Sequence, residues 1–266
     1  MRVGRSLFPF ILAFSFLIPS AAQQTASSSP QAVQYLQRAL AALNANTSVS
    51  DVTLTGTARR IAGSDDETGT TTLKAIVGAS RIDLNLSSGP RSEVQNQNSS
   101  GGSPAGTWSG PDGVVHPISF HNLLTEPAWF FPAFPIIHGL SLGYVATYVG
   151  PETRDGQAVE HITISQTFTV ETPSGAPTMA HLSQMDFFLD STTFLPAAVT
   201  FNIHPDDNEL VDIPIEVRFS DYHAVSGVQI PFHVQKFLNN GLVLDLQFAT
   251  AVLNTGLTAS HFQVGE

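Results

Sequence analysis

The chain has 266 residues, of which 42% are hydrophobic and only 12% are charged, and its formal net charge is −11. This apolar-rich composition excludes an intrinsically disordered chain, and the acidic balance argues against nucleic-acid binding, which needs a basic surface. Because the chain has no cysteine, disulfides, thiolate nucleophiles and iron–sulfur clusters are excluded as well.

The amino-terminal segment has the pattern of a secretory signal peptide. Arg2 and Arg5 flank the start of an apolar run at Ser6–Pro19, and small residues follow that run. The run is too short for a membrane-spanning helix, which needs about 20 apolar residues. We therefore expect residues 1–22 to be cleaved and residues 23–29 to be a polar linker. The mature protein is then periplasmic or secreted, with no integral membrane segment.

An amphipathic helix is predicted at Pro30–Leu43. Ser29 can cap its amino end, and Pro30 suits the first helical position, where no backbone N–H is needed. Apolar side chains then recur at helical spacing along the segment. Asn44 and Asn46 can end the helix.

After this helix the apolar period changes to two residues, which is typical of β-strands with one face in water. The pattern predicts about ten or eleven strands in sequence order, joined by hairpins. The fold class is therefore mainly β (α+β), with an antiparallel meander that curls into a half-barrel or closes. Within it, residues 87–106 are expected to form a long flexible loop with a weak strand near residues 91–95, and His181–Asp190 a strand.

An apolar segment without alternation interrupts the strands at residues 118–143. Pro127, Pro132 and Pro135 forbid one continuous helix in this segment. We expect short helices and turns that are heavily buried. Residues 30–266 then form a single domain that carries this helical insertion.

This order of elements resembles the periplasmic lipoprotein-carrier (LolA/LolB-like) superfamily. The local match is at the carboxyl-terminal end, where residues 217–222 (VRFSDY) and residues 225–232 (VSGVQIPF) precede a long hairpin through residues 239–241 (NNG). Such carriers often have the pattern F-x-x-Y-x-x-x-x-G-x-x-x-P before such a hairpin.

The resemblance implies a curled, incompletely closed half-barrel whose apolar cavity is covered by helices. In such carriers this cavity holds the acyl chains of a lipoprotein. The candidate plug or lid is Phe120–Leu140. An arginine on an early strand secures the lid in the carriers. Arg59 and Arg60 end the first predicted strand here, but neither is assigned to that role.

The aromatic residues of the insertion lead us to expect a site for a hydrophobic ligand. Burial of a large ring is worth about 1.5–3 kcal/mol, and burial of an acyl methylene about 0.8 kcal/mol, so a cavity walled by rings binds lipid. The alternative is that the rings only fill the concave side of the sheet. The expected ligand-binding residues are Trp129, Phe130, Phe131, Phe134, Ile137, Phe219 and Phe232.

No pattern indicates a catalytic site, a metal or a cofactor. His204-Pro205-Asp206-Asp207 is the densest group of donors but is also a turn signature, and His181, His223 and His233 lie on different predicted strands. Asp65-Asp66-Glu67 fits a solvated turn, since paired general acid and base carboxyls face one space about 5–10 Å apart. Nucleophile, phosphate-loop and dinucleotide motifs are absent.

The sequence therefore predicts an exported binding protein for a lipid, a lipidated protein or another hydrophobic ligand. The second hypothesis is a structural or protein-interaction module of the cell envelope with a filled core. The third is a hydrolase or a metal-dependent enzyme. The first hypothesis requires a connected apolar cavity, the second requires none, and the third requires several histidine or acidic side chains in one cleft.

Overall fold

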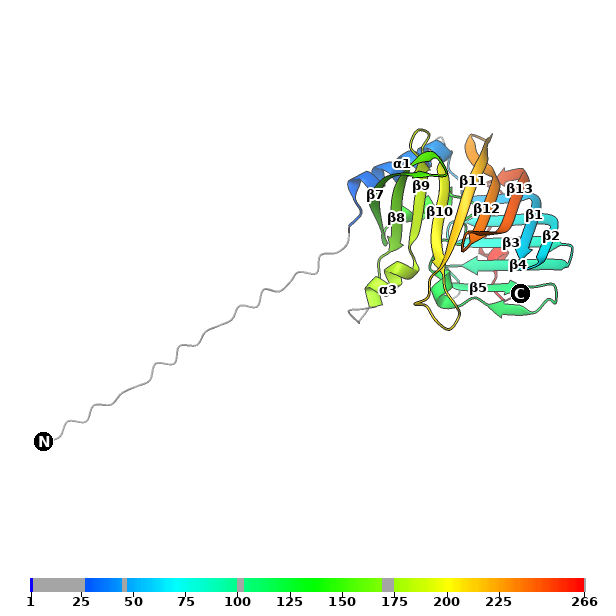
Figure 1. Cartoon of the computed structure of the whole chain (residues 1–266), viewed down its shortest axis with the longest axis horizontal. Helices are drawn as coiled ribbons and strands as arrows, with labels where there is room; N and C mark the ends of the chain where they lie inside the picture. The colour runs from blue at the N-terminus through cyan, green and yellow to red at the C-terminus, as the bar shows by residue number, and fades with distance from the viewer. Residues whose placement is uncertain (2–26, 45–46, 100–102, 169–174, 266) are drawn as a thin grey trace.

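The computed structural model describes Met1 and residues 27–44, 47–99, 103–168 and 175–265 (Figure 1). The predicted signal peptide, apart from Met1, lies outside the described residues, and so does most of the predicted linker. Within the described residues, no helix combines the length and the apolar character needed to cross a membrane.

One antiparallel sheet of 13 strands, in the order β6-β5-β4-β3-β2-β1-β13-β12-β11-β10-β9-β8-β7, forms the body of the molecule. It consists of two meanders. The first contains β1 (Asp51–Ala62), β2 (Asp65–Ile76), β3 (Ala79–Leu86), β4 (Gly89–Asn96), β5 (Ala105–Ser109) and β6 (Val115–Pro117). The second contains β7 (Tyr144–Arg154), β8 (Gln157–Gln166), β9 (Met185–Asp190), β10 (Pro196–Ile203), β11 (Ile213–Val225), β12 (Val228–Leu238) and β13 (Gly241–Leu253).

The first and last strands join the two meanders at the middle of the sheet. β1 pairs with β13 antiparallel, from Val52 opposite Leu253 to Arg60 opposite Leu244. The strands on either side of the apolar insertion, β6 and β7, therefore form the two open edges. The insertion connects one edge to the other, so it must cross a face of the sheet.

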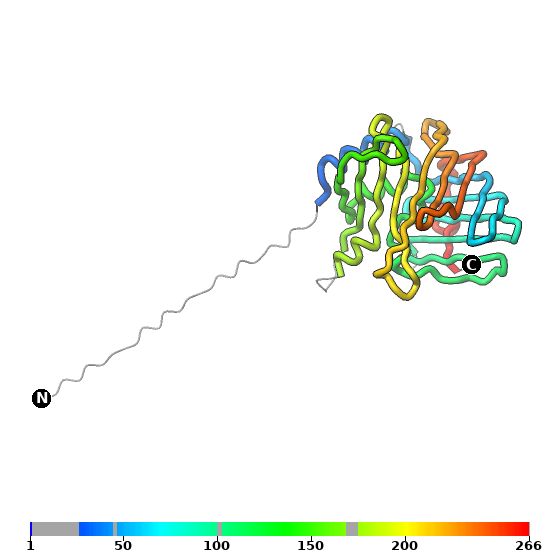
Figure 2. Tube along the Cα trace, viewed as in Figure 1, coloured from blue at the N-terminus to red at the C-terminus, as the bar shows by residue number. Residues whose placement is uncertain are grey.

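The sheet is strongly curled, so the strands of its two halves run in nearly perpendicular directions (Figures 1 and 2). Two glycines on the concave face mark the tight approach of neighbouring strands. A Cβ atom on Gly56 would lie 2.0 Å from the carbonyl oxygen of Gln247, and one on Gly69 would lie 1.9 Å from that of Asn85. A β-bulge also shifts the register between Thr55 and Gly56, which increases the local twist.

The predicted amino-terminal helix is confirmed as α1 (Pro30–Asn44). The Ser29 hydroxyl accepts a hydrogen bond from the backbone N–H of Ala32 at 3.2 Å, which caps the first turn. The backbone N–H of Ser29 also donates to the carbonyl of Ala146 in β7 at 2.8 Å. The start of α1 is thereby fixed against an edge strand, and Leu36 is fully buried in the core on the concave side.

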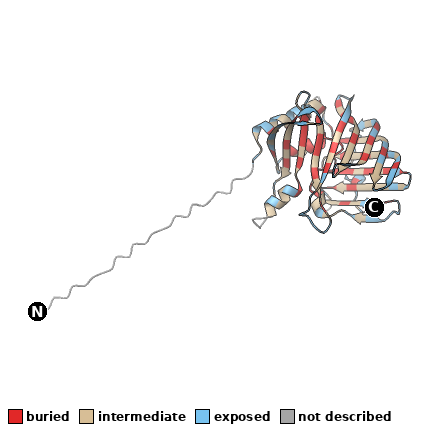
Figure 3. Ribbon diagram, in the orientation of Figure 1, coloured by how far each residue is buried: buried red, intermediate tan, exposed pale blue. Residues whose placement is uncertain are grey.

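The insertion folds into two short helices, as its prolines predict. They are the 3-10 helix η1 (Phe120–Leu123) and the α-helix α2 (Ala133–Gly139). The chain ends with a second 3-10 helix, η2 (Ala259–Phe262), whose Phe262 packs with Ala79 and Val94 outside the main core. Buried positions alternate with exposed ones along the strands, so one face of the sheet carries the main core (Figure 3).

The antiparallel half-barrel is confirmed, with two differences in detail. The sheet has 13 strands rather than ten or eleven, and the weak strand expected near residues 91–95 is a full member of it, β4. Polar residues form β4 because strands on both sides supply its hydrogen bonds. The expected strand at His181–Asp190 begins only at Met185. The helix α3 (Gly175–Leu182) precedes it, with Pro177 in its first turn, where proline is tolerated.

Candidate ligand-binding groove

Three of the seven expected ligand-binding residues are closed off in the core. Phe130, Phe131 and Phe134 are 0%, 1% and 0% exposed. The rings of Phe131 and Phe134 meet edge to face with centroids 4.8 Å apart. These rings fill the concave side of the sheet, so a ligand could enter this region only by displacing them.

Three more of the expected residues belong to the same packed cluster. Phe219 of β11 is buried, and Ile137 of α2 and Phe232 of β12 are half-buried against the core. The Phe232 ring also meets the exposed His223 ring edge to face, with centroids 4.9 Å apart. The structure brings these side chains to the concave face but packs them against protein.

The seventh residue, Trp129, borders an open groove beside the filled region. Two adjoining cavities of about 270 and 220 Å³ share Glu93, Trp108, Trp129 and Lys236 in their walls. We call this feature the Trp108–Trp129 groove. Its remaining apolar walls come from Ile82 and Leu84 of β3, Leu244 of β13, Phe201 and Ile203 of β10, and Ile118 of the insertion.

The two tryptophans have different roles in the groove. Trp108 lies on β5 directly across from Glu93 of β4, is 45% exposed, and stacks on His116 of β6 with centroids 4.4 Å apart. Trp129, from the insertion, is only 3% exposed. Trp129 therefore belongs to the packed insertion, whereas the Trp108 ring remains free to contact a ligand.

Charged side chains from three strands surround this apolar surface. The ammonium of Lys236 lies 4.6 Å from the centroid of the Trp129 ring. Burial lowers the pKa of Lys236, and the charge of Glu93 partly opposes that effect. Arg60 of β1 and Arg91 of β4 both contact one carboxylate oxygen of the buried Glu67, at 3.5 and 3.3 Å.

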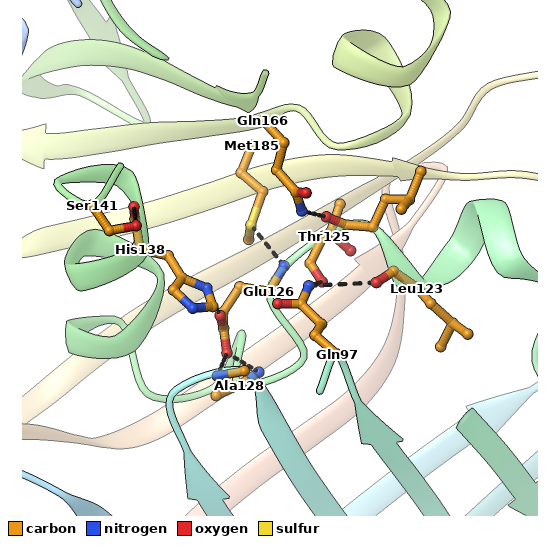
Figure 4. Close-up of polar contacts among 11 residues, drawn as sticks. Gln97, Leu123, Thr125, Glu126, Ala128, His138, Ser141, Gln166 and Met185 are labelled. Carbon is orange, nitrogen blue, oxygen red and sulfur yellow. Dashed lines mark hydrogen bonds and ion pairs between the residues drawn. The ribbon is translucent and has the colours of Figure 1, made fainter. Parts of the chain in front are cut away.

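A buried carboxylate fixes the insertion next to the groove (Figure 4). Glu126 is 4% exposed and accepts hydrogen bonds from the backbone N–H groups of Gly78 at 3.1 Å and Ala128 at 3.3 Å. Its other carboxylate oxygen contacts Nδ1 of His138 in α2. The His138 ring stacks on Tyr144, whose pKa is raised by its own burial and by the charge of Glu126.

Two glutamines, one from each half of the sheet, bind the same segment of the insertion (Figure 4). Gln97 donates to the carbonyls of Thr125 at 2.7 Å and Leu123 at 3.4 Å. Gln166 of β8 donates to the carbonyl of Leu124 at 2.6 Å. Together with the Glu126 contacts, these bonds attach the insertion to both halves of the sheet.

Sequence reasoning missed Glu126, although a signal was present. It is the only Asp, Glu, Lys or Arg in residues 118–143, an otherwise apolar segment. A lone carboxylate in such a segment is either paired or carries a large desolvation cost. Lys236 gives a similar signal, because it continues the alternating apolar positions Val228, Ile230 and Val234 of β12.

The three histidines expected on different strands lie beside three different aspartates, and one of these, Asp212, also lies 3.5 Å from Nδ1 of His204. Nε2 of His181 lies 2.9 Å from Asp212, that of His223 lies 2.9 Å from Asp221, and that of His233 lies 3.0 Å from Asp245. Within the described residues, no group of three or more histidine or acidic side chains is placed to hold a metal ion.

The acidic run at residues 65–67 begins β2 and does not form a free turn. Asp66 forms an ion pair with Arg59 at 2.6 Å, whereas Glu67 turns to the opposite face and contacts Arg60 and Arg91. Successive strand residues point to opposite faces, so the Asp66 and Glu67 carboxylates do not face one space. This arrangement is unsuited to paired acid–base chemistry.

The sequence matches no protein-family model and no curated protein. Solved structures do share the fold. A domain described as an outer membrane lipoprotein-sorting protein, from Vibrio parahaemolyticus, aligns with a TM-score of 0.53 at 14% identity, over 88% of this chain and 96% of its own.

Two other solved structures give the same picture. A DUF1329 family protein from Desulfovibrio piger has a TM-score of 0.55 at 11% identity, over 89% of this chain and 98% of its own. A LolA superfamily protein from Nitrosomonas europaea has a TM-score of 0.52 at 11% identity, over 87% of this chain and 97% of its own. The resemblance to LolA-like proteins is therefore confirmed at the level of the fold.

Proposed function

We propose that the protein is an exported binding protein, periplasmic or secreted, that holds the apolar chain of a lipid, a lipidated protein or another hydrophobic ligand. The observation that carries the proposal is the Trp108–Trp129 groove on the concave face of a LolA-like fold. Export rests on the signal-peptide pattern of residues 1–22. No catalytic step is part of the proposal.

The filled core shifts the proposed contacts away from most of the rings expected from the sequence. Phe130, Phe131 and Phe134 stay packed in the core, while the exposed Trp108 ring contacts the ligand and the Trp129 ring forms part of the groove wall. The two cavities are each smaller than the roughly 300–1,000 Å³ of a typical enclosed ligand pocket. We therefore propose that the chain lies along an open groove, with part of its length in water.

A second candidate is a non-catalytic protein-interaction module of the cell envelope. Complete burial of the Phe130, Phe131 and Phe134 rings favours it, because a filled core needs no ligand. In that case the same groove and the exposed Trp108 would contact a protein partner.

The decisive experiment uses the mature chain, Gln23–Glu266, exported to a bacterial periplasm and purified without detergent. Native mass spectrometry, followed by organic extraction and lipid mass spectrometry, would detect a bound ligand. A stoichiometric lipid, or uptake of added fatty acid, supports the carrier function. A ligand-free mass with no uptake moves the interaction module to first place.

The test variant is Trp108→Ala, because Phe131→Asp would place an unpaired charge in the core and report on folding. The matched control is Val149→Ala, an exposed apolar residue on the edge strand β7. We expect Trp108→Ala to weaken the affinity for lipid at least roughly fivefold, since loss of a ring contact costs about 1 kcal/mol or more. Val149→Ala should bind like the wild type.

A further inference from the structure

We propose that Lys236 binds the anionic group of an amphiphilic ligand whose apolar chain lies in the Trp108–Trp129 groove. This inference rests on the proposed function and deepens it by naming the chemical class of the ligand: an apolar chain that ends in a phosphate, carboxylate or similar anion.

The first observation is the distribution of positive charge. The chain has 11 basic side chains against 22 acidic ones, and two of the basic residues, Arg2 and Arg5, lie in the predicted signal peptide. Of the other nine, Arg60, Arg91 and Lys236 all line the smaller cavity of the groove. Three of the nine basic side chains outside the predicted signal peptide thus lie at one apolar surface of an acidic protein.

The second observation is that this positive charge is incompletely neutralised. Arg60 and Arg91 share the single carboxylate of Glu67. Lys236 forms no ion pair within 4.0 Å with any described residue, and its close contact is the Trp129 ring. Glu93 attracts it only at longer range, and the Glu93 carboxylate already accepts a hydrogen bond from Gln95 at 2.8 Å.

The third observation is the position of Lys236 on its strand. Val228, Ile230 and Val234 of β12 are fully buried on the concave face, and Lys236 continues the same row. Placing a half-buried ammonium there costs desolvation energy that a neutral residue would avoid. A bound anion would form a charge-assisted hydrogen bond with this ammonium and offset that cost.

The fourth observation separates an amphiphile from a small free anion. The Lys236 ammonium is bordered by Trp129 and shares its cavity with Ile82, Leu84 and Leu244. A small anion would lose hydration beside these apolar side chains without burying any apolar surface of its own. An attached alkyl chain contributes about 0.8 kcal/mol for each methylene that it buries.

The test uses the intrinsic fluorescence of the mature chain, because both of its tryptophans border the groove. Decyl phosphate, 1-decanol and inorganic phosphate are titrated separately, with the amphiphile below its micellar concentration. The variants are Lys236→Met, Lys236→Arg and Lys74→Met. Lys74 is the only other lysine and lies on the opposite face of β2 from the buried Leu73 and Ala75, so Lys74→Met is the matched control.

We expect the wild type to bind decyl phosphate roughly tenfold more tightly than decanol, and inorganic phosphate much more weakly than either. Lys236→Met should abolish the preference for the phosphate while retaining the affinity for decanol. Lys236→Arg and Lys74→Met should keep the preference. Retained decanol binding by Lys236→Met shows that this variant is folded.

Three results would overturn the inference. Equal affinity for decyl phosphate and decanol, or a preference that Lys236→Met retains, removes the role of Lys236 and leaves the proposed function standing. Inorganic phosphate that binds as tightly as decyl phosphate would make this a small-anion site. No response to either amphiphile, with no uptake by native mass spectrometry, would remove the proposed function and this inference together.

Discussion

Lys236 combines a charge with an apolar environment, and its effect on stability depends on pH. Burial lowers its pKa below the usual 10.5, so the folded protein binds this proton less tightly than the unfolded chain does. The Lys236 charge therefore lowers the free energy of unfolding. This effect is at its full size below the folded-state pKa and disappears as the pH rises through 10.5. Without ligand, the charge therefore opposes folding at neutral pH.

We accordingly predict that Lys236→Met raises the free energy of unfolding at pH 7 and that this gain shrinks as the pH approaches 10.5. Urea unfolding of wild type and variant at pH 7, 9 and 10.5 would measure it. If the gain in free energy of unfolding stays constant over this range, the buried charge of Lys236 is not its cause, because the contribution of that charge must vanish as Lys236 loses its proton.

His204 should make the protein sensitive to mild acid. Its side chain is completely covered. Its Nδ1 lies 3.2 Å from the carbonyl of Val211, and its Nε2 has no hydrogen-bond partner among the described residues. Burial lowers its pKa below 6.5, and the neighbouring His121 and His181 add to this effect, while the Val211 bond and Asp212 oppose it. Protonation is therefore more favourable in the unfolded chain.

The stability that depends on neutral His204 is complete above pH 6.5 and is lost as the pH falls below that value. We predict that the thermal midpoint falls less between pH 7 and pH 5 in His204→Gln than in the wild type. His223→Gln is the control, because the His223 side chain is 56% exposed. Parallel pH profiles for wild type and His204→Gln would refute the assignment.

At the scale of elements, close strand approach on the concave face depends on glycine. A Cβ on Gly69 of β2 would overlap the backbone of β3. We predict that Gly69→Ala lowers the free energy of unfolding by about 1–3 kcal/mol, since backbone must move. Gly110→Ala, where the nearest atom would be 3.4 Å away, should change it by less than about 0.5 kcal/mol. Chemical denaturation of both variants compares them directly.

Elements whose signal is local could be predicted from the sequence. Ser29 and Pro30 predicted the start of α1, the two-residue apolar period predicted the strands, and three prolines predicted the broken insertion. The weak strand expected near residues 91–95 is confirmed as β4, but its signal was faint because its side chains are mostly polar and its stability comes from the strands beside it.

The candidate site could be predicted only in part, because its residues are far apart in the chain. Trp129 was expected to contact a ligand, and it does border the groove. Its neighbours Phe130 and Phe131 are aromatic residues of the same apolar segment but are buried in the core. Trp108 and Lys236 join the site through a curled sheet whose register no local pattern specifies.

At the scale of the whole molecule, the pairing of β1 with β13 holds the two meanders together. Asp51, at the start of β1, is 1% exposed and accepts hydrogen bonds from Ser50, from the backbone and hydroxyl of Thr255, and from the backbone of Gly256. Burial alone would raise its pKa, but these bonds outweigh burial and lower it.

We predict that Asp51→Ala lowers the free energy of unfolding by about 2–3 kcal/mol, because it leaves these donors without their acceptor. Asp207→Ala, in an exposed turn, should have little effect. Since the pKa of Asp51 is lowered, its stabilising contribution is present above pH 3.8 and is lost as the pH falls further. Urea unfolding at pH 7 and pH 3 tests both statements.

The central position of β13 has a consequence for when the chain can fold. The last strand of the sheet in chain order completes its middle, so β1 and β12 each lack a neighbour until β13 has been made. Contacts that span about 200 residues form slowly. A chain of this topology therefore keeps its sheet open between β1 and β12 until β13 has been made and can pair with both.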